Sequence, residues 1–405
     1  MISPELAPLP DAPLGVAVSG GGDSVALLML LYNAGKDIHA ATVDHQLRPE
    51  SAQEAAGVAA LCARYDIPHQ TLVWQSPDIR GNLQNQARKA RRSLLAGWAR
   101  RQGLADIVLG HTQDDQAETF LMRLARGSGV DGLSGMAPMR CVAGLCWHRP
   151  MLGLARDELR EYLRLKNIDW VEDPGNDDLK YDRIKARKAL EILAPLGLNV
   201  SRLAETSDHL RRARHALEVT VQELARQAIT LSDAGELCIS LQYFRLAPRE
   251  IQLRLLAAAL RWVASVRYRP RFNALVGLLD ACLDQPQKPR TLHGCSIGVT
   301  RDHIIVNREV SATPAMAALE TIWDGRWEIG CFDLENVKIK ALGKDGIRFC
   351  QNWRETGHSR TSLLASPSFW QNGVLIAAPF ANFGDKVRVN LAGGKKGFYD
   401  RLITH

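Results

Sequence analysis

The stretch Ser19-Gly20-Gly21-Gly22-Asp23-Ser24 constrains the fold most, because it separates two apolar segments that have different secondary-structure patterns. Before it, LGVAV is a short β-rich apolar run; after it, VALLMLLYN continues as a longer apolar segment of helical character. Three consecutive glycines expose backbone N–H groups at the positive end of a helix dipole. The stretch therefore predicts an anion-binding turn between a strand and a helix.

Two familiar nucleotide-binding loops do not match this turn. The chain has no GxxxxGK[ST] motif at this place, and its glycine spacing does not match GxGxxG. A purely structural turn, with Asp23 or Ser24 capping the helix, is the main alternative. It would have to account for both serines, the glycines and the aspartate together, so anion binding is the better interpretation.

The first 150 residues repeat one order of elements, a short β-rich run followed by a polar loop and a helical segment. The expected strands are LGVAVS, IHAATVDH, HQTLVW and ADIVLGH. Strands that alternate with helices indicate βαβ units. We therefore expect an α/β fold with a doubly wound, mostly parallel sheet.

Beyond residue 150 the pattern changes to amphipathic helices, and from about residue 290 to short apolar runs between Gly, Asp and Asn turns. We predict an α/β domain over residues 1–200, a helical domain over 201–310, and a small β-rich region over 311–405.

The composition, 46% hydrophobic and 23% charged residues, is that of a soluble globular protein, and the net charge of +7 slightly favours a polyanionic partner. The eight cysteines include no CxxC pair, so we expect reduced thiols, mostly small core residues; Cys141 and Cys146 are the nearest pair. Without a signal peptide or a membrane-spanning run, a cytoplasmic protein is expected.

SGGGDS resembles the SGGxDS loop of the PP-loop ATP pyrophosphatases. This resemblance implies ATP cleavage between the α and β phosphates, with the loop holding pyrophosphate and Mg²⁺ sharing its charge. It also implies the adenine nucleotide α-hydrolase-like fold of that superfamily.

Three further blocks resemble the tRNA(Ile)-lysidine synthase family: TVDHQLRPES at 42–51, LGHTQDDQAETFLMRLARGSGVDGLSGM at 109–136 and VEDPGNDDLKYDRIKARKAL at 171–190. The likeness is strong over residues 14–190, fair to about 325 and weak beyond. Gln46, Gln113 and Gly175 stand where that family usually has glycine, alanine and serine.

The resemblance implies a two-step ligation that uses ATP and Mg²⁺. The C2 oxygen of the wobble cytidine, in the CAU anticodon of tRNA(Ile), attacks the α-phosphate of ATP. Free lysine then attacks C2 through its ε-amine and expels AMP, which changes decoding from AUG to AUA. The resemblance implies a catalytic role for residues 1–200, substrate or tRNA binding by residues 201–310 and a tRNA contact in residues 311–405. The expected partners are this tRNA and free lysine, with no membrane. Whether the protein forms a homodimer is left open.

The resemblance also implies roles for particular residues. The expected ATP-binding residues are Ser19, Gly20, Gly21, Gly22, Asp23, Ser24 and Asp44. The expected catalytic residues are Asp44, His111, Asp114, Asp115 and Glu118, with Asp23 and Asp115 as Mg²⁺ ligands. The expected phosphate or tRNA contacts are Arg88, Arg91, Arg123, Arg126, Arg183 and Arg187, and Asp173, Pro174 and Asn176 are expected in a turn.

Structural alternatives exist for several of these residues. Asp115 could cap a helix with Glu118 closing a capping box, and Asp44 could pair with Arg48 at the surface. The arginines could line solvated helix faces.

Three other functions are open to such a chain. A tRNA-thiolating PP-loop enzyme would generally need paired cysteines, and a nitrogen-transferring ligase would need a source of ammonia. A basic nucleic-acid-binding module with an inactive nucleotide fold would need neither the intact SGGGDS loop nor the downstream carboxylates. The co-substrate, whether lysine, ammonia or a sulfur donor, separates the enzymes.

Overall fold

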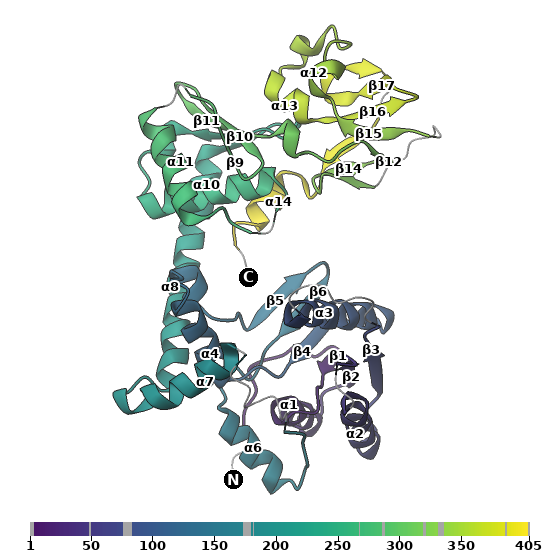
Figure 1. Ribbon diagram of the computed structural model, residues 1–405, viewed down its shortest axis with the longest axis vertical. Helices are drawn as coiled ribbons and strands as arrows, with labels where there is room; N and C mark the ends of the chain where they lie inside the picture. Colours follow the sequence, from purple (N-terminus) through teal and green to yellow (C-terminus); the bar gives the residue numbers. More distant parts are fainter. Residues whose placement is uncertain are drawn as a thin grey trace. The chain divides into compact units, whose positions relative to one another are not determined.

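A computed structural model describes residues 4–47, 50–75, 83–172, 180, 182–266, 268–285, 288–318, 321–330, 336–384 and 387–403 (Figure 1). Arg48, Asp173, Pro174 and Asn176 lie outside this part of the chain. The chain forms two compact units, Met1–Arg214 and His215–Thr404, and the boundary falls within helix α8 (Val200–Ala228). The three-domain division of the chain stays a prediction.

The first unit contains a six-stranded sheet in the order β3-β2-β1-β4-β6-β5. Its strands are β1 (Leu14–Ala17), β2 (Ile38–Asp44), β3 (His69–Val73), β4 (Asp106–Leu109), β5 (Met139–Val142) and β6 (Leu145–His148). All neighbours pair in parallel except β5 and β6, which form an antiparallel hairpin. The predicted mostly parallel sheet is confirmed.

Helices cover both faces of this sheet, as Figure 1 shows with α3 above it and α1, α2 and α6 below. The helices of this unit are α1 (Gly22–Asn33), α2 (Ser51–Arg64), α3 (Leu83–Arg101), α4 (Gln113–Leu124), α5 (Val130–Leu133), α6 (Arg156–Leu165) and α7 (Asp182–Leu193), followed by the 3₁₀ turn η2 (Ala194–Leu196). Successive residues of β1 face opposite sides of the sheet and so contribute to two cores. Val16 packs with α1 on one side, and on the other Gly15 leaves room for the ring of Trp98 in α3. The doubly wound fold is therefore confirmed.

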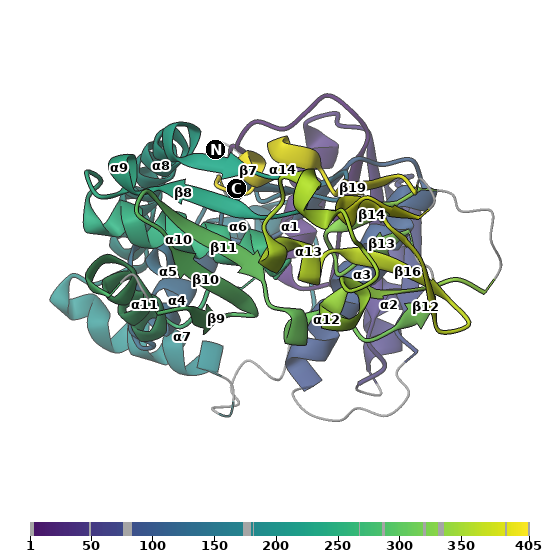
Figure 2. The same ribbon diagram turned by 90° about the horizontal axis from the view of Figure 1, so that it is seen from above.

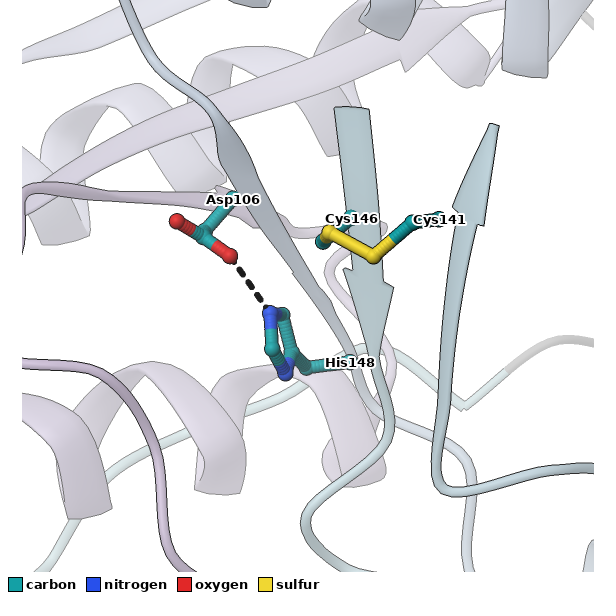
Figure 3. Close-up of a disulfide and its surroundings, with 4 residues drawn as sticks. All are labelled: Asp106, Cys141, Cys146 and His148. Atoms are coloured by element: carbon teal, nitrogen blue, oxygen red, sulfur yellow. Dashed lines mark hydrogen bonds and ion pairs between the residues drawn. A yellow bond between two sulfur atoms is a disulfide. The ribbon is translucent and has the colours of Figure 1, made fainter. Parts of the chain in front are cut away.

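The β5–β6 hairpin contains a disulfide that the sequence patterns did not predict. Cys141 and Cys146 face each other in the strand register and are joined through their sulfur atoms (Figure 3). The tight turn between them uses positive φ angles at Ala143 and Gly144. The expectation of reduced thiols is thus wrong for this pair. The spacing of the two cysteines matches no known motif, and it is the hairpin that aligns them. The other described cysteines are free thiols, and all but Cys238 are buried.

The second unit contains a five-stranded antiparallel sheet in the order β7-β8-β11-β10-β9, whose strands lie side by side in Figure 2. Its strands are β7 (Ile229–Leu231), β8 (Leu237–Ser240), β9 (Arg290–Leu292), β10 (Cys295–Val299) and β11 (His303–Arg308). The accompanying helices are α9 (Leu241–Phe244), α10 (Arg249–Val263) and α11 (Phe272–Asp284). Strands β9, β10 and β11 fall where the sequence patterns predicted short β-rich runs, whereas β7 and β8 fall where those patterns indicated helices.

Two smaller sheets follow. One has the order β12-β15-β16-β17-β18 and the other β13-β14-β19. Their strands are β12 (Ala317–Ala318), β13 (Ile322–Trp323), β14 (Trp327–Ile329), β15 (Lys338–Ala341), β16 (Pro367–Gln371), β17 (Val374–Ala378), β18 (Phe383–Gly384) and β19 (Val389–Leu391). Short helical segments connect them: η3 (Val310–Ala312), α12 (Gly343–Gly346), η4 (Trp353–Thr356), α13 (Arg360–Ala365), η5 (Pro379–Ala381) and α14 (Gly394–Asp400). Within the described residues, no helix is both long and apolar enough to cross a membrane.

Candidate active site

The glycine loop connects β1 to α1, and its first and last residues, Ser19 and Ser24, are joined by a hydrogen bond. Ser24 Oγ accepts a hydrogen bond from the Ser19 N–H at 3.0 Å and donates one to the Gly21 carbonyl at 2.9 Å. Helix α1 begins at Gly22 with Gly21 as its N-cap, without a side-chain cap. The alternative of Asp23 or Ser24 as the cap is therefore wrong, since both already lie within the first helical turn.

The glycines of this region also allow close packing of the chain against itself. Gly20 has a φ of +88°, and its carbonyl accepts the Val171 N–H at 2.9 Å. Gly110 follows β4, where a Cβ atom would lie only 3.0 Å from Cα of Ser24. The end of β4 therefore lies directly against the start of α1.

Asp44 ends β2 at the carboxyl edge of the sheet and is buried. Its Oδ1 accepts the Gln46 N–H at 2.8 Å, and Gln46 has a φ of 51°. A left-handed conformation is easiest for glycine. This explains why glycine suits the position that Gln46 occupies in this chain.

Thr112 caps helix α4. The Thr112 N–H donates to Oδ2 of Asp115 at 2.9 Å, and the Asp115 N–H donates to Oγ1 of Thr112 at 3.4 Å. The expectation that Asp115 caps the helix and Glu118 closes a capping box is wrong, because the extended residue before the helix is Thr112 and the residue three positions later is Asp115. Glu118 lies one turn further along.

Glu118 is the centre of a buried ion-pair network. Its side chain is 1% exposed, and its carboxylate accepts hydrogen bonds from Nε of Arg183 at 2.9 Å and Nε of Arg187 at 3.1 Å. A third guanidinium, that of Arg156, lies 3.3 Å away. Arg183 and Arg187, expected to contact phosphate, are therefore fixed by a residue expected to be catalytic.

Arg156 is a site residue that the sequence patterns did not single out. Its guanidinium lies 3.2 Å from Oδ2 of Asp23, 3.5 Å from Oδ1 of Asp115 and 3.3 Å from Oε1 of Glu118. Its backbone N–H also donates to Oδ2 of Asp114 at 2.8 Å. One signal was present in the sequence: an arginine at the first position of a helix faces the positive end of its dipole and needs a nearby anion.

Burial and the arginines around it keep His111 neutral. Burial, assisted by Arg149, Arg91 and Arg183, lowers the pKa of His111 to about 3, although Asp115 opposes this shift. An imidazole with this pKa carries no proton to donate as an acid near pH 7. It can still accept a hydrogen bond.

Two carboxylates of the site respond differently to burial. Burial raises the pKa of Asp23 above its usual value, although Arg156 opposes the shift. Burial would also raise the pKa of Asp115, but Arg183, the hydrogen bond from the Thr112 N–H and Arg156 outweigh it and lower that pKa. Asp115 is therefore an ionised carboxylate at neutral pH.

The six predicted arginines do not form one group. Burial lowers the pKa of Arg91, and the positive charges of Arg88 and Arg183 add to this shift, whereas Asp115 opposes it. Arg123 instead donates to the Gly132 carbonyl at 2.6 Å, and exposed Arg126 pairs with Asp182 at 3.0 Å. The structure thus brings Arg183 and Arg187 to the carboxylates, whereas Arg123 and Arg126 are engaged elsewhere.

The predicted Mg²⁺ ligands fit a metal that arrives with a nucleotide. Among the residues that the structure describes, no group of three or more His, Cys, Asp or Glu side chains is arranged to hold a metal. Asp23 and Asp115 approach each other through their shared partner Arg156. Mg²⁺ at ATP sites usually takes one or two carboxylates together with phosphates and water, which this pair can supply.

Comparisons with known proteins agree on one family. Residues 3–193 match the PP-loop domain family. The chain is 43% identical over 401 residues to the tRNA(Ile)-lysidine synthase of Ruegeria pomeroyi, covering 98% of this chain and 95% of that protein. It is 36% identical to the enzyme of the same name from Wolbachia pipientis (78% and 76% covered) and 33% identical to that from Anaplasma marginale (92% and 84% covered).

Proposed function

The chain belongs to the tRNA(Ile)-lysidine synthase family, and we propose that it joins free lysine to C2 of the wobble cytidine in the CAU anticodon of tRNA(Ile). Membership makes it a ligase that forms lysidine in tRNA and uses ATP through its PP-loop domain. The proposal adds an adenylated cytidine intermediate, release of AMP and pyrophosphate, and a change of decoding from AUG to AUA.

In the first step, the loop of residues 19–24 would hold the pyrophosphate that leaves when the cytidine C2 oxygen attacks the α-phosphate. Gly20, Gly21 and Gly22 allow close approach of phosphate oxygens to backbone N–H groups. Asp44 would contact ATP from the neighbouring strand end. A bound Mg²⁺ would neutralise part of the phosphate charge.

In the second step, Asp114 and Asp115 would orient the lysine ε-amine toward C2. The neutral His111 suits this task, because it accepts a hydrogen bond from an amine without repelling an ammonium group. Arg91, Arg183 and Arg187 would contact phosphates of the tRNA or the nucleotide. Glu118 would act through the arginines that it fixes.

One observation carries this proposal beyond family membership. Arg156 contacts Asp23, which belongs to the pyrophosphate loop, and Asp115, which belongs to the DDQAET helix. The part of the site expected to cleave ATP and the part expected to bind lysine are therefore one continuous site.

The experiment is incubation of the protein with labelled ATP, lysine and unmodified tRNA. We expect pyrophosphate release that requires a wobble cytidine, AMP release that requires both lysine and a wobble cytidine, and lysidine in the digested tRNA. A tRNA carrying uridine at the wobble position is the control substrate. Turnover with ammonia or a sulfur donor in place of lysine would contradict the proposal.

Asp115→Ala tests the carboxylate within the same assay. We expect it to lose tRNA-dependent AMP formation, whereas Thr112→Ala, which removes the same helix cap but keeps the carboxylate, should retain most activity. Full activity of Asp115→Ala would remove this residue from the catalytic set. We also propose a cytoplasmic location; sedimentation of the purified protein tests for a homodimer.

A further inference from the structure

Arg156 lies where two functional segments of the first unit meet. Asp23 comes from the first turn of α1, directly after the pyrophosphate loop, and Asp115 and Glu118 come from α4. The strands that precede these helices, β1 and β4, are neighbours in the sheet. Arg156, as the first residue of α6, contacts the carboxylates of both helices.

These carboxylates require a shared cation. Asp23, Asp115 and Glu118 have side chains that are 24%, 11% and 1% exposed, so water screens their mutual repulsion poorly. The planar guanidinium presents its N–H groups in a fixed fork and can engage several carboxylates at once. In this structure each of its three nitrogens faces a different carboxylate.

We propose that Arg156 is a positioning residue for lysidine formation, which holds the pyrophosphate loop and the α4 carboxylates in one geometry through Asp23, Asp115 and Glu118. The inference rests on the proposed function, because it assigns ATP to the loop and lysine to α4. Since Arg156 ties the two parts together, its loss should slow both half-reactions rather than one.

The first test measures the two half-reactions of Arg156→Gln separately. Pyrophosphate release without lysine reports adenylation, and lysidine formation from preformed adenylated tRNA reports lysine transfer. We expect both rate constants to fall about 100-fold, the scale of a misplaced reacting group. A fall in pyrophosphate release alone would overturn the proposal, because it would make Arg156 a phosphate contact.

Arg156→Lys and Arg160→Gln are the matched variants. Lysine restores the charge but cannot face three carboxylates with a planar fork, so we expect near-normal thermal stability with less than about a tenth of the rate. Arg160 lies one turn along the same helix and pairs with Glu172 at 3.4 Å, so its glutamine variant should keep the wild-type rate. A wild-type rate in Arg156→Lys would overturn the proposal.

A double-mutant cycle of Arg156→Gln with Asp23→Asn tests whether Arg156 acts through Asp23 or independently of it. If Arg156 acts through Asp23, the double variant should be no slower than the slower single variant. Losses that multiply would show that Arg156 acts independently of Asp23. A wild-type protein that makes no lysidine would refute the proposed function itself, whereas an active wild type with an equally active Arg156→Gln would refute only this inference.

Discussion

The carboxylate of Glu118 accepts a hydrogen bond from Nε of Arg183 at 2.9 Å, in a position where the glutamate side chain is 1% exposed. The family resemblance assigned these two residues to different tasks, catalysis and phosphate contact. Their pairing makes them parts of one charged network, in which a change at Glu118 also removes one partner of Arg187 and one of Arg156.

Glu118→Gln should destabilise the protein. The substitution leaves three guanidinium groups close together without their shared carboxylate, and breaking a buried pair in this way costs about 3 kcal/mol or more. Denaturant unfolding measures the change in free energy. Glu172→Gln, which removes a more exposed partner of Arg160, should cost less than about 1 kcal/mol. Equal effects of the two substitutions would contradict the network.

Gly110→Ala should impair ATP use. The added Cβ would meet backbone atoms, 3.0 Å from Cα of Ser24 and 3.1 Å from the carbonyl oxygen of Asp23, so the loop must shift. We expect the KM for ATP to rise about tenfold or more. Gly57→Ala is the control, since its Cβ would meet nothing within 4 Å on a helix, and it should stabilise by up to about 1 kcal/mol. An unchanged KM for Gly110→Ala would argue against the close approach of β4 and α1.

The stability of the protein should fall as the solution becomes acidic, in part because of His111. Its folded-state pKa is about 3, whereas an unfolded histidine titrates near about 6.5. The unfolded chain therefore binds this proton more readily, so the stabilisation is complete above about pH 6.5 and is lost as the pH falls toward 3. Melting temperatures at about pH 7.5 and about pH 5.0 should differ more for the wild type than for His111→Gln. Identical differences would contradict the depressed pKa.

Reduction of the Cys141–Cys146 disulfide should lower stability modestly. The bond closes a short loop across one hairpin, for which chain entropy predicts about 2 kcal/mol. Dithiothreitol should therefore lower the melting temperature of the wild type. A variant with serine at both positions should start at the lower value and show no response to dithiothreitol. A wild type insensitive to the reductant would mean that the bond does not form in solution.

The parts of the fold that the sequence predicted depend on short-range patterns. Apolar runs that alternate with helical segments indicated the parallel sheet, and SGGGDS indicated the turn after its central strand. The β5–β6 disulfide was not predicted, because no short-range sequence pattern indicates that Cys141 and Cys146 face each other. The strands β7 and β8 were not predicted either, since the prevailing pattern around them is that of amphipathic helices.

By itself, the sequence determined the alternation of the first four strands with helices, the residue types of the loop and the DDQAET helix, and the resemblance that led to the family. Only the tertiary structure decided which charges meet. Arg156 is 133 positions from Asp23 and 38 from Glu118, and Arg183 is 65 from Glu118. Ion-pair partners at such separations are selected by the packing of α4 against α7 and of α6 against α1, because a buried carboxylate is stable only where folding brings a cation to it.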